Sequence, residues 1–227
     1  MLDKNTRQSI IALIQREVVP AVGCTEPIAV ALCTARATET LGQRPEKITV
    51  MLSANILKNA MGVGIPGTGM IGLPIAIALG AIVGRSEYEL EVIKDVTPET
   101  LEEGKAYVDE KRIDIRLKAD ITEKLYIDVV CEAVGSKAEA VISGSHTNFV
   151  YISRDGETLL DVKNTGCEDG DNGDPELCMR TVYDFATTTP VDEIAFILKT
   201  RQYNLKAAEE SVKGNFGHCL GKTIDLS

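Results

Sequence analysis

The spacing of apolar residues in the first quarter of the chain predicts two helices followed by a strand. Apolar side chains recur every three to four positions over residues 5–19, which is typical of an amphipathic helix. Pro20 ends this pattern, and Pro27 in a first turn favours a second, Ala-rich helix that continues to about Leu41. Apolar side chains at every second position then predict a strand at residues 48–52.

The period of the pattern changes again in the rest of the chain. Residues 72–83 form a largely apolar helical pattern, and residues 87–110 form a helical, acidic one. Period-two alternation then predicts four strands, at residues 113–117, 125–129, 138–143 and 148–153. The dipeptide Asp155-Gly156 is a hairpin turn signal.

Strands in the middle of the chain, flanked by helices, predict an α+β fold with a central, mostly antiparallel sheet. A surface loop rich in Gly, Asp and Asn is expected at residues 164–175, and a final helix at residues 189–213. We assign residues 1–213 to one domain and residues 214–227 to a tail or linker.

Composition excludes several classes of function. The 227 residues include 34 acidic and 24 basic side chains, so the net charge is −10. This balance argues against nucleic-acid and anionic-membrane binding, because phosphate neutralisation needs clustered Lys and Arg. The longest apolar run, Met70–Val83, is too short to span a bilayer. The first residues lack the basic and apolar regions of a signal peptide, so we expect a cytoplasmic protein.

The six cysteines have neither Cys-x-x-Cys nor zinc-finger spacing. A cytoplasmic location disfavours disulfides, so most of these residues are expected to be small buried apolar side chains, and Cys131, in the strand pattern of Leu125–Val134, fits this role. Only two histidines, His146 and His218, are present, and we expect no complete metal site within this chain.

The stretch from Ser53 to Gly72 is unusual because it holds five glycines, two asparagines, a lysine and a proline. Two overlapping G-x-G-x-x-G matches suggest a dinucleotide loop, but the predicted strand ends some nine residues before Gly62, and Pro66 interrupts the first match. Close backbone packing in a helix–loop–helix is a second interpretation. We favour a third, a loop that binds a small anion through backbone N–H groups. Hydrogen bonds and one charge could come from Asn55, Lys58, Asn59 and Thr68.

Two further residues are candidates for chemistry. Cys24 lies at the predicted start of a helix, where the N-terminus favours a thiolate, whereas Glu26 nearby favours the thiol. Reactive and merely structural roles both stay open for it. His146 lies between two predicted strands among polar residues, so it is either an acid–base or substrate-binding group or a solvated loop residue. A Cys24–His146 catalytic pair would require that the fold brings them together.

Three segments taken together resemble the L-cysteine desulfidase family, also described as serine dehydratase alpha-chain-like. They are Gly23–Pro27 (GCTEP), the pair Ser53–Asn59 (SANILKN) and Pro66–Pro74 (PGTGMIGLP), and His146–Asn148 (HTN). The resemblance implies a lyase that converts L-cysteine, or L-serine, to pyruvate, ammonia and sulfide, or water. It also implies an oxygen-sensitive [4Fe–4S] cluster, one iron of which acts as a Lewis acid on the leaving group.

The resemblance also implies roles for individual residues. Cys24 becomes the candidate base or substrate-proximal thiol, and His146 lies in a pocket segment. The implied substrate-binding residues are Ser53, Asn55, Lys58, Asn59, Thr147 and Asn148, with a carboxylate cradle formed by Gly67, Thr68 and Gly69.

Members of this family are much longer, and their cluster cysteines lie in the second half. We therefore expect the N-terminal, active-site half of such an enzyme, which binds no cluster by itself and is inactive alone. Its expected partners are a small amino acid and the missing C-terminal half or a partner subunit, and an exposed docking face would favour homodimers. The alternative is a non-catalytic module that binds a small amino acid or carboxylate.

Overall fold

The computed structural model describes part of the 227-residue chain, namely residues 2–21, 23–162, 175–214 and 223–224. The chain divides into two units, which are Met1–Val19 with Glu168–Ser227, and Pro20–Cys167. The expected tail, residues 214–227, and the expected loop, residues 164–175, fall mostly outside the described residues. The domain boundary drawn between residues 213 and 214 stays a prediction.

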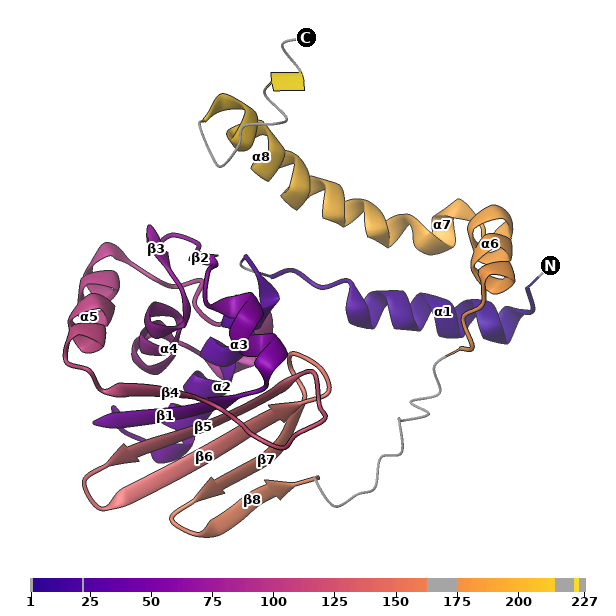
Figure 1. Cartoon of the computed structure of the whole chain (residues 1–227). Coiled ribbons are helices and arrows are strands. Elements are labelled where there is room, and N and C mark those ends of the chain that lie inside the picture. Colours follow the sequence, from indigo (N-terminus) through magenta and orange to yellow (C-terminus); the bar gives the residue numbers. More distant parts are fainter. Residues whose placement is uncertain (1, 22, 163–174, 215–222, 225–227) are drawn as a thin grey trace. The chain divides into compact units, whose positions relative to one another are not determined.

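The larger unit is built on a six-stranded sheet (Figure 1). Its strands are β1 (Lys47–Leu52), β4 (Ile113–Leu117), β5 (Tyr126–Ala133), β6 (Ser136–Ser143), β7 (Phe149–Arg154) and β8 (Glu157–Asp161). Their order across the sheet is β4-β1-β5-β6-β7-β8, and only the β1–β4 pair is parallel. The predicted α+β fold with a mostly antiparallel sheet is confirmed.

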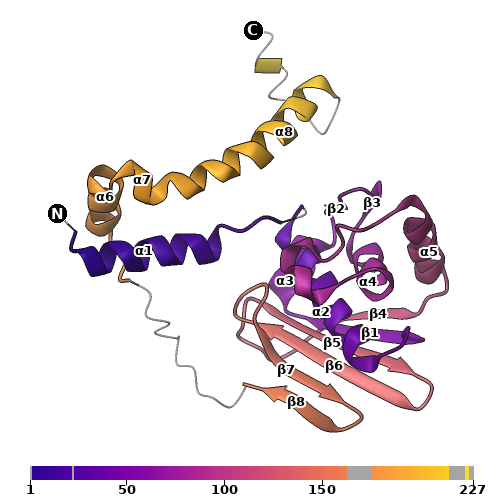
Figure 2. The ribbon, with the colours of Figure 1, turned by 180° about the vertical axis from the view of Figure 1, so that it is seen from behind.

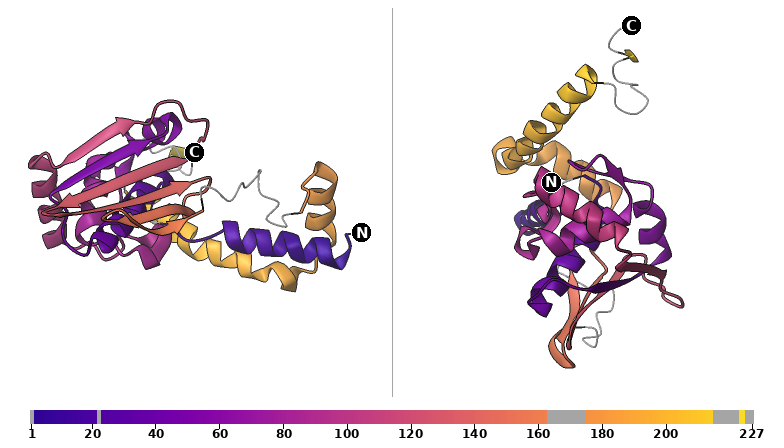
Figure 3. Two further views of the ribbon diagram at one scale, coloured as in Figure 1. Left: turned by 90° about the horizontal axis from the view of Figure 1, so that it is seen from below. Right: turned by 90° about the vertical axis from the view of Figure 1, so that its left-hand side faces the viewer.

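The helices of this unit lie on one face of the sheet, as the two opposite views of Figures 1 and 2 agree. In the left view of Figure 3 the strands lie in front of these helices. The helices are α2 (Thr25–Leu41), α3 (Ala54–Ala60), α4 (Leu73–Ile82), the 3₁₀ helix η1 (Ser86–Glu91) and α5 (Pro98–Asp109). The predicted acidic helix over residues 87–110 is wrong as one element, because Thr97 and Pro98 start a new helix with a capping box.

Alternation along the strands separates a buried face from a polar one. Three buried rows run across β1, β5 and β6: Ile48–Cys131–Ala138, Val50–Val129–Ala140 and Leu52–Ile127–Ile142. On the opposite face, Lys47 of β1, Glu132 of β5 and Lys137 of β6 are neighbours across the three strands. The Lys47 Nζ forms an ion pair with Glu132 Oε2 at 3.5 Å. The period-two pattern therefore put the apolar side chains against the helices.

Helices α2 and α4 approach closely in this core. A Cβ added at Gly80 of α4 would lie 2.5 Å from the backbone oxygen of Ala31 in α2. Residues Ile28 to Ala35 of α2 and Leu73 to Leu79 of α4 are buried almost throughout. A helix that is apolar all round is expected to be enclosed, as α4 is, whereas α2 keeps a polar side with the exposed Arg36 and Glu39.

The glycine-rich stretch belongs to the long connection between the parallel strands β1 and β4. Its first part is not a loop as expected but the helix α3, which the Ser53 side chain caps by accepting from the Ile56 N–H. The glycines follow in a small hairpin formed by β2 (Gly64–Ile65) and β3 (Met70–Ile71). Because α3 separates β1 from Gly62, the immediate strand-to-loop turn of a dinucleotide fingerprint is missing.

The predicted hairpin turn at Asp155-Gly156 is confirmed. It joins β7 to β8, and both residues have positive φ, 50° for Asp155 and 87° for Gly156. These angles are those of a turn that matches the twist of the flanking strands.

The smaller unit is helical in its described residues. It contains α1 (Lys4–Glu17), α6 (Met179–Thr188), α7 (Val191–Ile194), the 3₁₀ helix η2 (Ala195–Leu198) and α8 (Lys199–Lys213). Arg7 of α1 forms a two-fold ion pair with Glu193 of α7, with Nε–Oε2 3.0 Å and Nη2–Oε1 3.1 Å. The first helix was predicted within two residues, whereas the final predicted helix is divided among α7, η2 and α8. Across the described part of the chain, no helix has both the length and the apolar character needed to cross a membrane.

Candidate functional site

Cys24 lies where α2 begins, and its thiol is bound to a carboxylate. It is the N-cap residue of α2, but its side chain makes no capping hydrogen bond to the helix. Cys24 Sγ instead donates to Glu26 Oε2 at 2.9 Å. Thr25 Oγ1 donates to the same oxygen at 3.3 Å, and Asn59 Nδ2 donates to Glu26 Oε1 at 3.2 Å. Glu26 therefore links the start of α2 to the end of α3.

The hydrogen bond between Cys24 and Glu26 decides which of the two carries the proton. Burial, followed by the hydrogen bond to Glu26, raises the pKa of the Cys24 thiol above its usual value. The same hydrogen bond is the largest cause that lowers the pKa of the Glu26 carboxyl. At neutral pH the pair is therefore a neutral thiol donating to a carboxylate, and the helix N-terminus does not produce a thiolate here.

Glu26 is the residue that sequence reasoning undervalued. From the sequence it was only a charge that opposes a thiolate, whereas in the structure it accepts hydrogen bonds from three side chains. Its position two residues after Cys24, in the first turn of the predicted helix, was the available signal. Carboxylates are favoured at this end of a helix by the helix dipole.

The GCTEP turn and the glycine-rich hairpin are in contact. Gly23 has φ of +80°, and a Cβ at this position would lie 2.6 Å from Pro66 Cγ and 2.9 Å from Pro66 Cδ. Both the backbone angle and the contact require glycine. Gly67 follows Pro66 directly in the sequence. The carboxylate cradle that the resemblance implies, formed by Gly67, Thr68 and Gly69, therefore adjoins the turn that contains Cys24. Two of the three resembling segments thus meet in space.

Within the hairpin, Gly67 and Gly69 expose backbone N–H groups. Both residues are exposed with positive φ, 76° and 64°, and a Cβ at either would meet nothing within 4 Å. Neither N–H donates to a protein acceptor among the residues that the structure describes. Thr68 is different, since its Oγ1 donates to the Ile65 carbonyl at 2.6 Å and accepts from the Met70 N–H at 3.0 Å. Its side chain shapes the turn while the flanking amides stay available.

Helix α3 contributes one polar face beside Glu26. Asn55, Lys58 and Asn59 lie at positions i, i+3 and i+4 and therefore share a side of the helix. Asn55 and Lys58 are exposed, and Asn59 is half-buried against Glu26. Ser53 is 2% exposed, and its hydroxyl donates to the Lys124 carbonyl at 2.8 Å. The structure therefore gives Ser53 a capping role, and its substrate-binding role stays a prediction.

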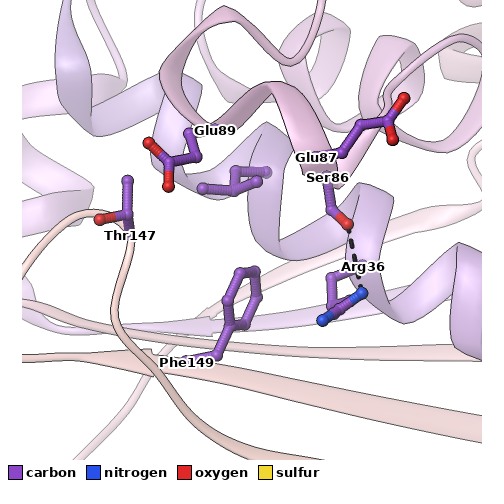
Figure 4. A pocket seen from close by; sticks show the side chains of 7 residues that line it. Arg36, Ser86, Glu87, Glu89, Thr147 and Phe149 are labelled. Carbon is purple, nitrogen blue, oxygen red and sulfur yellow. Dashed lines mark hydrogen bonds between the residues drawn. The ribbon is translucent and has the colours of Figure 1, made fainter. Parts of the chain in front are cut away.

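The His146–Asn148 segment lies farther along α2. Thr147 and Phe149 share a depression of about 330 Å³ with Leu32 and Arg36 of α2, as Figure 4 shows. The remaining lining residues are Ser86, Glu87 and Glu89. Leu32 and Arg36 are eight and twelve residues after Cys24, which at a rise of 1.5 Å per residue is about 12–18 Å along the helix.

No hydrogen bond joins Cys24 to His146 among the described residues, and Asn148 Nδ2 donates instead to the Ser143 carbonyl at 2.9 Å. In Figure 4 the Arg36 guanidinium lies near Phe149, with 5.6 Å to the ring centroid, and Nη1 donates to Ser86 Oγ at 3.5 Å. The third resembling segment therefore borders a separate depression, and catalytic or binding roles for His146, Thr147 and Asn148 stay predictions.

A [4Fe–4S] cluster needs several thiolate ligands, and the described residues do not fit one. In the described ranges no three His, Cys, Asp or Glu side chains gather as a metal-binding group. Cys33 and Cys131 are buried in the sheet–helix core, and Cys178 is exposed in the smaller unit. Three further candidates, Cys167, His218 and Cys219, lie outside the described residues. The described residues therefore provide no ligand set for a cluster.

Comparison with known proteins finds similar chains that are about twice as long. The chain is 65% identical over 223 residues to a UPF0597 protein of Bacteroides fragilis ATCC 25285, covering 98% of this chain and 52% of the relative. It is 62% identical over 227 residues to a UPF0597 protein of Phocaeicola vulgatus, and the match covers 100% of this chain and 53% of that relative. It is 47% identical to a UPF0597 protein of Porphyromonas gingivalis, and this match covers 100% of this chain and 54% of that relative. The chain spans about half the length of the curated relatives it matches.

These relatives carry a name that states no activity. No protein-family model matches the chain, and no solved structure matches it. The resemblance to the L-cysteine desulfidase family therefore rests on the motifs alone, and the lyase activity and its cofactor stay predictions.

Proposed function

We propose that this chain is the amino-acid-binding part of a cluster-dependent lyase that degrades L-cysteine, or L-serine, to pyruvate and ammonia. The observation that carries the proposal is the 2.9 Å hydrogen bond from the Cys24 thiol to Glu26, next to a hairpin with two available amides. These are the elements that the elimination needs from the protein: a proton acceptor for the substrate α-carbon and donors for its carboxylate. The chain alone is expected to be inactive.

The proton acceptor is the Cys24–Glu26 pair. In the proposed step, the thiol proton moves to Glu26 Oε2 while Cys24 Sγ takes the proton from the substrate α-carbon. The electron pair of the broken C–H bond forms the Cα=Cβ bond, and HS⁻ leaves from L-cysteine, or hydroxide from L-serine. The aminoacrylate product hydrolyses to pyruvate and ammonia. The lowered pKa of Glu26 keeps it ionised at neutral pH, so the carboxylate is free to receive this proton, and the same shift favours its return to Cys24 afterwards.

The carboxylate and ammonium of the substrate are assigned to two neighbouring groups. The backbone N–H groups of Gly67 and Gly69 donate to the carboxylate. The Glu26 carboxylate, oriented by Asn59, offers the negative charge that an ammonium prefers, and the contact of Gly23 with Pro66 joins its turn to the hairpin. Lys58 and Asn55 are exposed on the face of α3 that also carries Asn59.

The test uses a full-length chimera, in which this chain replaces the matched 223-residue segment of the Bacteroides fragilis relative. The chimera is purified and loaded with iron and sulfide anaerobically, and sulfide and pyruvate are measured with L-cysteine and with L-serine. Cys24→Ala and Glu26→Gln are each expected to lower kcat by at least about a hundredfold, the usual range for acid–base groups. Cys178→Ala, in the smaller unit, is the control and keeps full activity.

A folded, cluster-loaded chimera that forms neither sulfide nor pyruvate would contradict the proposal. Near-normal turnover of Cys24→Ala would exclude its role as base while leaving the lyase assignment intact. A non-catalytic amino-acid-binding module is the alternative, favoured by the available amides of Gly67 and Gly69, which this chain supplies without any partner. Calorimetric binding of L-cysteine or L-serine to an inactive chimera would support that alternative.

A further inference from the structure

The smaller unit buries very few of its own side chains. Among its described residues, 2–19, 175–214 and 223–224, only Ile10, Ile11 and Thr189 are buried. A core residue of a stable domain usually touches six to twelve others, and domains of about 60 residues are already marginal. These helices therefore lack most of the core that would hold them in place.

The lack of buried side chains is clearest in helix α8. None of its 15 residues is buried, and an isolated helix of this length is marginal in water. Two of its apolar side chains, with the last residue of η2, nevertheless form a stripe with a seven-residue spacing, which we call the α8 stripe: Leu198 of η2, and Leu205 and Val212 of α8. These residues are 64%, 44% and 39% exposed. Leu198 and Leu205 also line a depression of about 460 Å³ with Arg201 and Gln202. Such a stripe is typical of a helix that packs against another element.

Helix α6 repeats the pattern. It has no buried residue, although Met179 and Tyr183 are 84% and 62% exposed and lie four residues apart on one side of the helix. Val191, which opens α7, is 76% exposed. The unpartnered apolar surface thus extends over several elements of the smaller unit, beyond a single helix.

Three occupants could cover the α8 stripe: the larger unit of this chain, a second copy of the chain, or additional chain. Self-pairing is disfavoured because the stripe spans only two heptads, and Arg201 lies between Leu198 and Leu205 on the same side. In a parallel pair Arg201 would face its own copy, and like charges would repel. The relatives offer additional chain directly, because about 200 of their residues lie outside the matched half.

We infer that the α8 stripe and the exposed apolar side chains of α6 dock against the additional half of the longer polypeptide, and complete a helical domain. The smaller unit then contributes only part of that domain, while the larger unit has its own core. This inference rests on burial and on the length of the relatives, and it is independent of the reaction proposed above.

The experiment compares the 227-residue chain with the full-length chimera described above. Leu205→Cys is introduced on the α8 stripe and Ser211→Cys on the other side of α8, and maleimide labelling of each is followed by peptide mass spectrometry. In the chain alone both introduced thiols are expected to label at similar rates. In the chimera, Leu205→Cys is expected to label at least about tenfold more slowly, while Ser211→Cys is unchanged.

A second pair of variants tests the energy of the contact. Leu205→Glu with Val212→Glu is compared with Ala207→Glu with Ser211→Glu, which adds the same charge on the other side of α8. Only the first pair is expected to lower the Tm of the chimera, and neither changes the Tm of the chain alone. Equal labelling of both thiols in a cooperatively folded chimera would overturn the inference. Protection of Leu205→Cys in the chain alone would also overturn it, in favour of a second copy if the mass is dimeric and of the larger unit if the mass is monomeric.

Discussion

Replacing Gly23 by Ala tests whether the contact between the GCTEP turn and the glycine-rich hairpin holds the site together. The backbone at Gly23 has φ of +80°, where a side chain costs about 1–2 kcal/mol. The new Cβ would lie 2.6 Å from Pro66 Cγ, whereas carbon atoms prefer about 3.5–4.0 Å, so one segment must move by about 1 Å. Overpacking of this kind costs about 1–3 kcal/mol, which gives a total destabilisation of about 2–5 kcal/mol.

Gly135→Ala is the matched control. Gly135, in the turn between β5 and β6, has φ of +72°, but a Cβ there would meet nothing within 4 Å. The Gly135→Ala variant should therefore lose only the free energy that the strained backbone angle costs, about 1–2 kcal/mol. Pro66→Ala removes the two ring atoms that clash, so it should restore about 1–3 kcal/mol when combined with Gly23→Ala.

The free energy of unfolding of these variants is measured by urea denaturation, followed by far-UV circular dichroism. Coupling between positions 23 and 66 that exceeds about 1 kcal/mol would support the contact. Equal losses in the free energy of unfolding for Gly23→Ala and Gly135→Ala, without coupling between Gly23→Ala and Pro66→Ala, would show that Gly23 and Pro66 are not in contact.

Three further predictions use the same chain. Glu26→Gln removes the carboxylate that helps to raise the pKa of Cys24, so alkylation of Cys24, followed by peptide mass spectrometry, should shift to lower pH. Gly80→Ala forces a Cβ to 2.5 Å from the Ala31 backbone oxygen, and urea denaturation should give a loss of about 1–3 kcal/mol or more. Burial raises the pKa of Tyr107 from 10.0 to about 12 in the folded chain, so the unfolded chain ionises first and stability should fall between about pH 10 and 12. Denaturation across this range should show a smaller fall for Tyr107→Phe.

The regular elements could be predicted because each has one dominant period. The apolar rows of β1, β5 and β6 follow a period of two, interrupted only where Asp128 and Val141 are also buried on the other face, and α2 and α4 begin within two residues of the predicted Pro27 and Gly72. The 3₁₀ helix η1 was missed because Glu89, with φ of 48°, breaks an acidic stretch that looks helical in sequence. Such a backbone reversal leaves no signal in the pattern of hydrophobic residues.

The site was less predictable because its parts come together through contacts that a sequence does not encode locally. The meeting of Gly23 with Pro66 depends on how α2 and the β1–β4 connection pack on the sheet. The position of Thr147 beside Leu32 and Arg36 depends on how the β6–β7 connection packs along α2. Two of the resembling segments therefore meet in space, whereas the third borders a separate depression.

The charge around the hairpin favours a zwitterionic amino acid over the nucleotide that the glycine pattern first suggested. A phosphate group bound at the Gly67 and Gly69 amides would share the hairpin with the turn that carries Glu26, because Gly23 contacts Pro66, and the lowered pKa of Glu26 keeps its carboxylate ionised at neutral pH. Like charges in a partly buried position repel, and no Lys or Arg side chain pairs with Glu26 among the described residues. An α-amino acid avoids this conflict, because its ammonium can face Glu26 while its carboxylate takes the amides. The position of Glu26 therefore favours a zwitterionic ligand over a nucleotide.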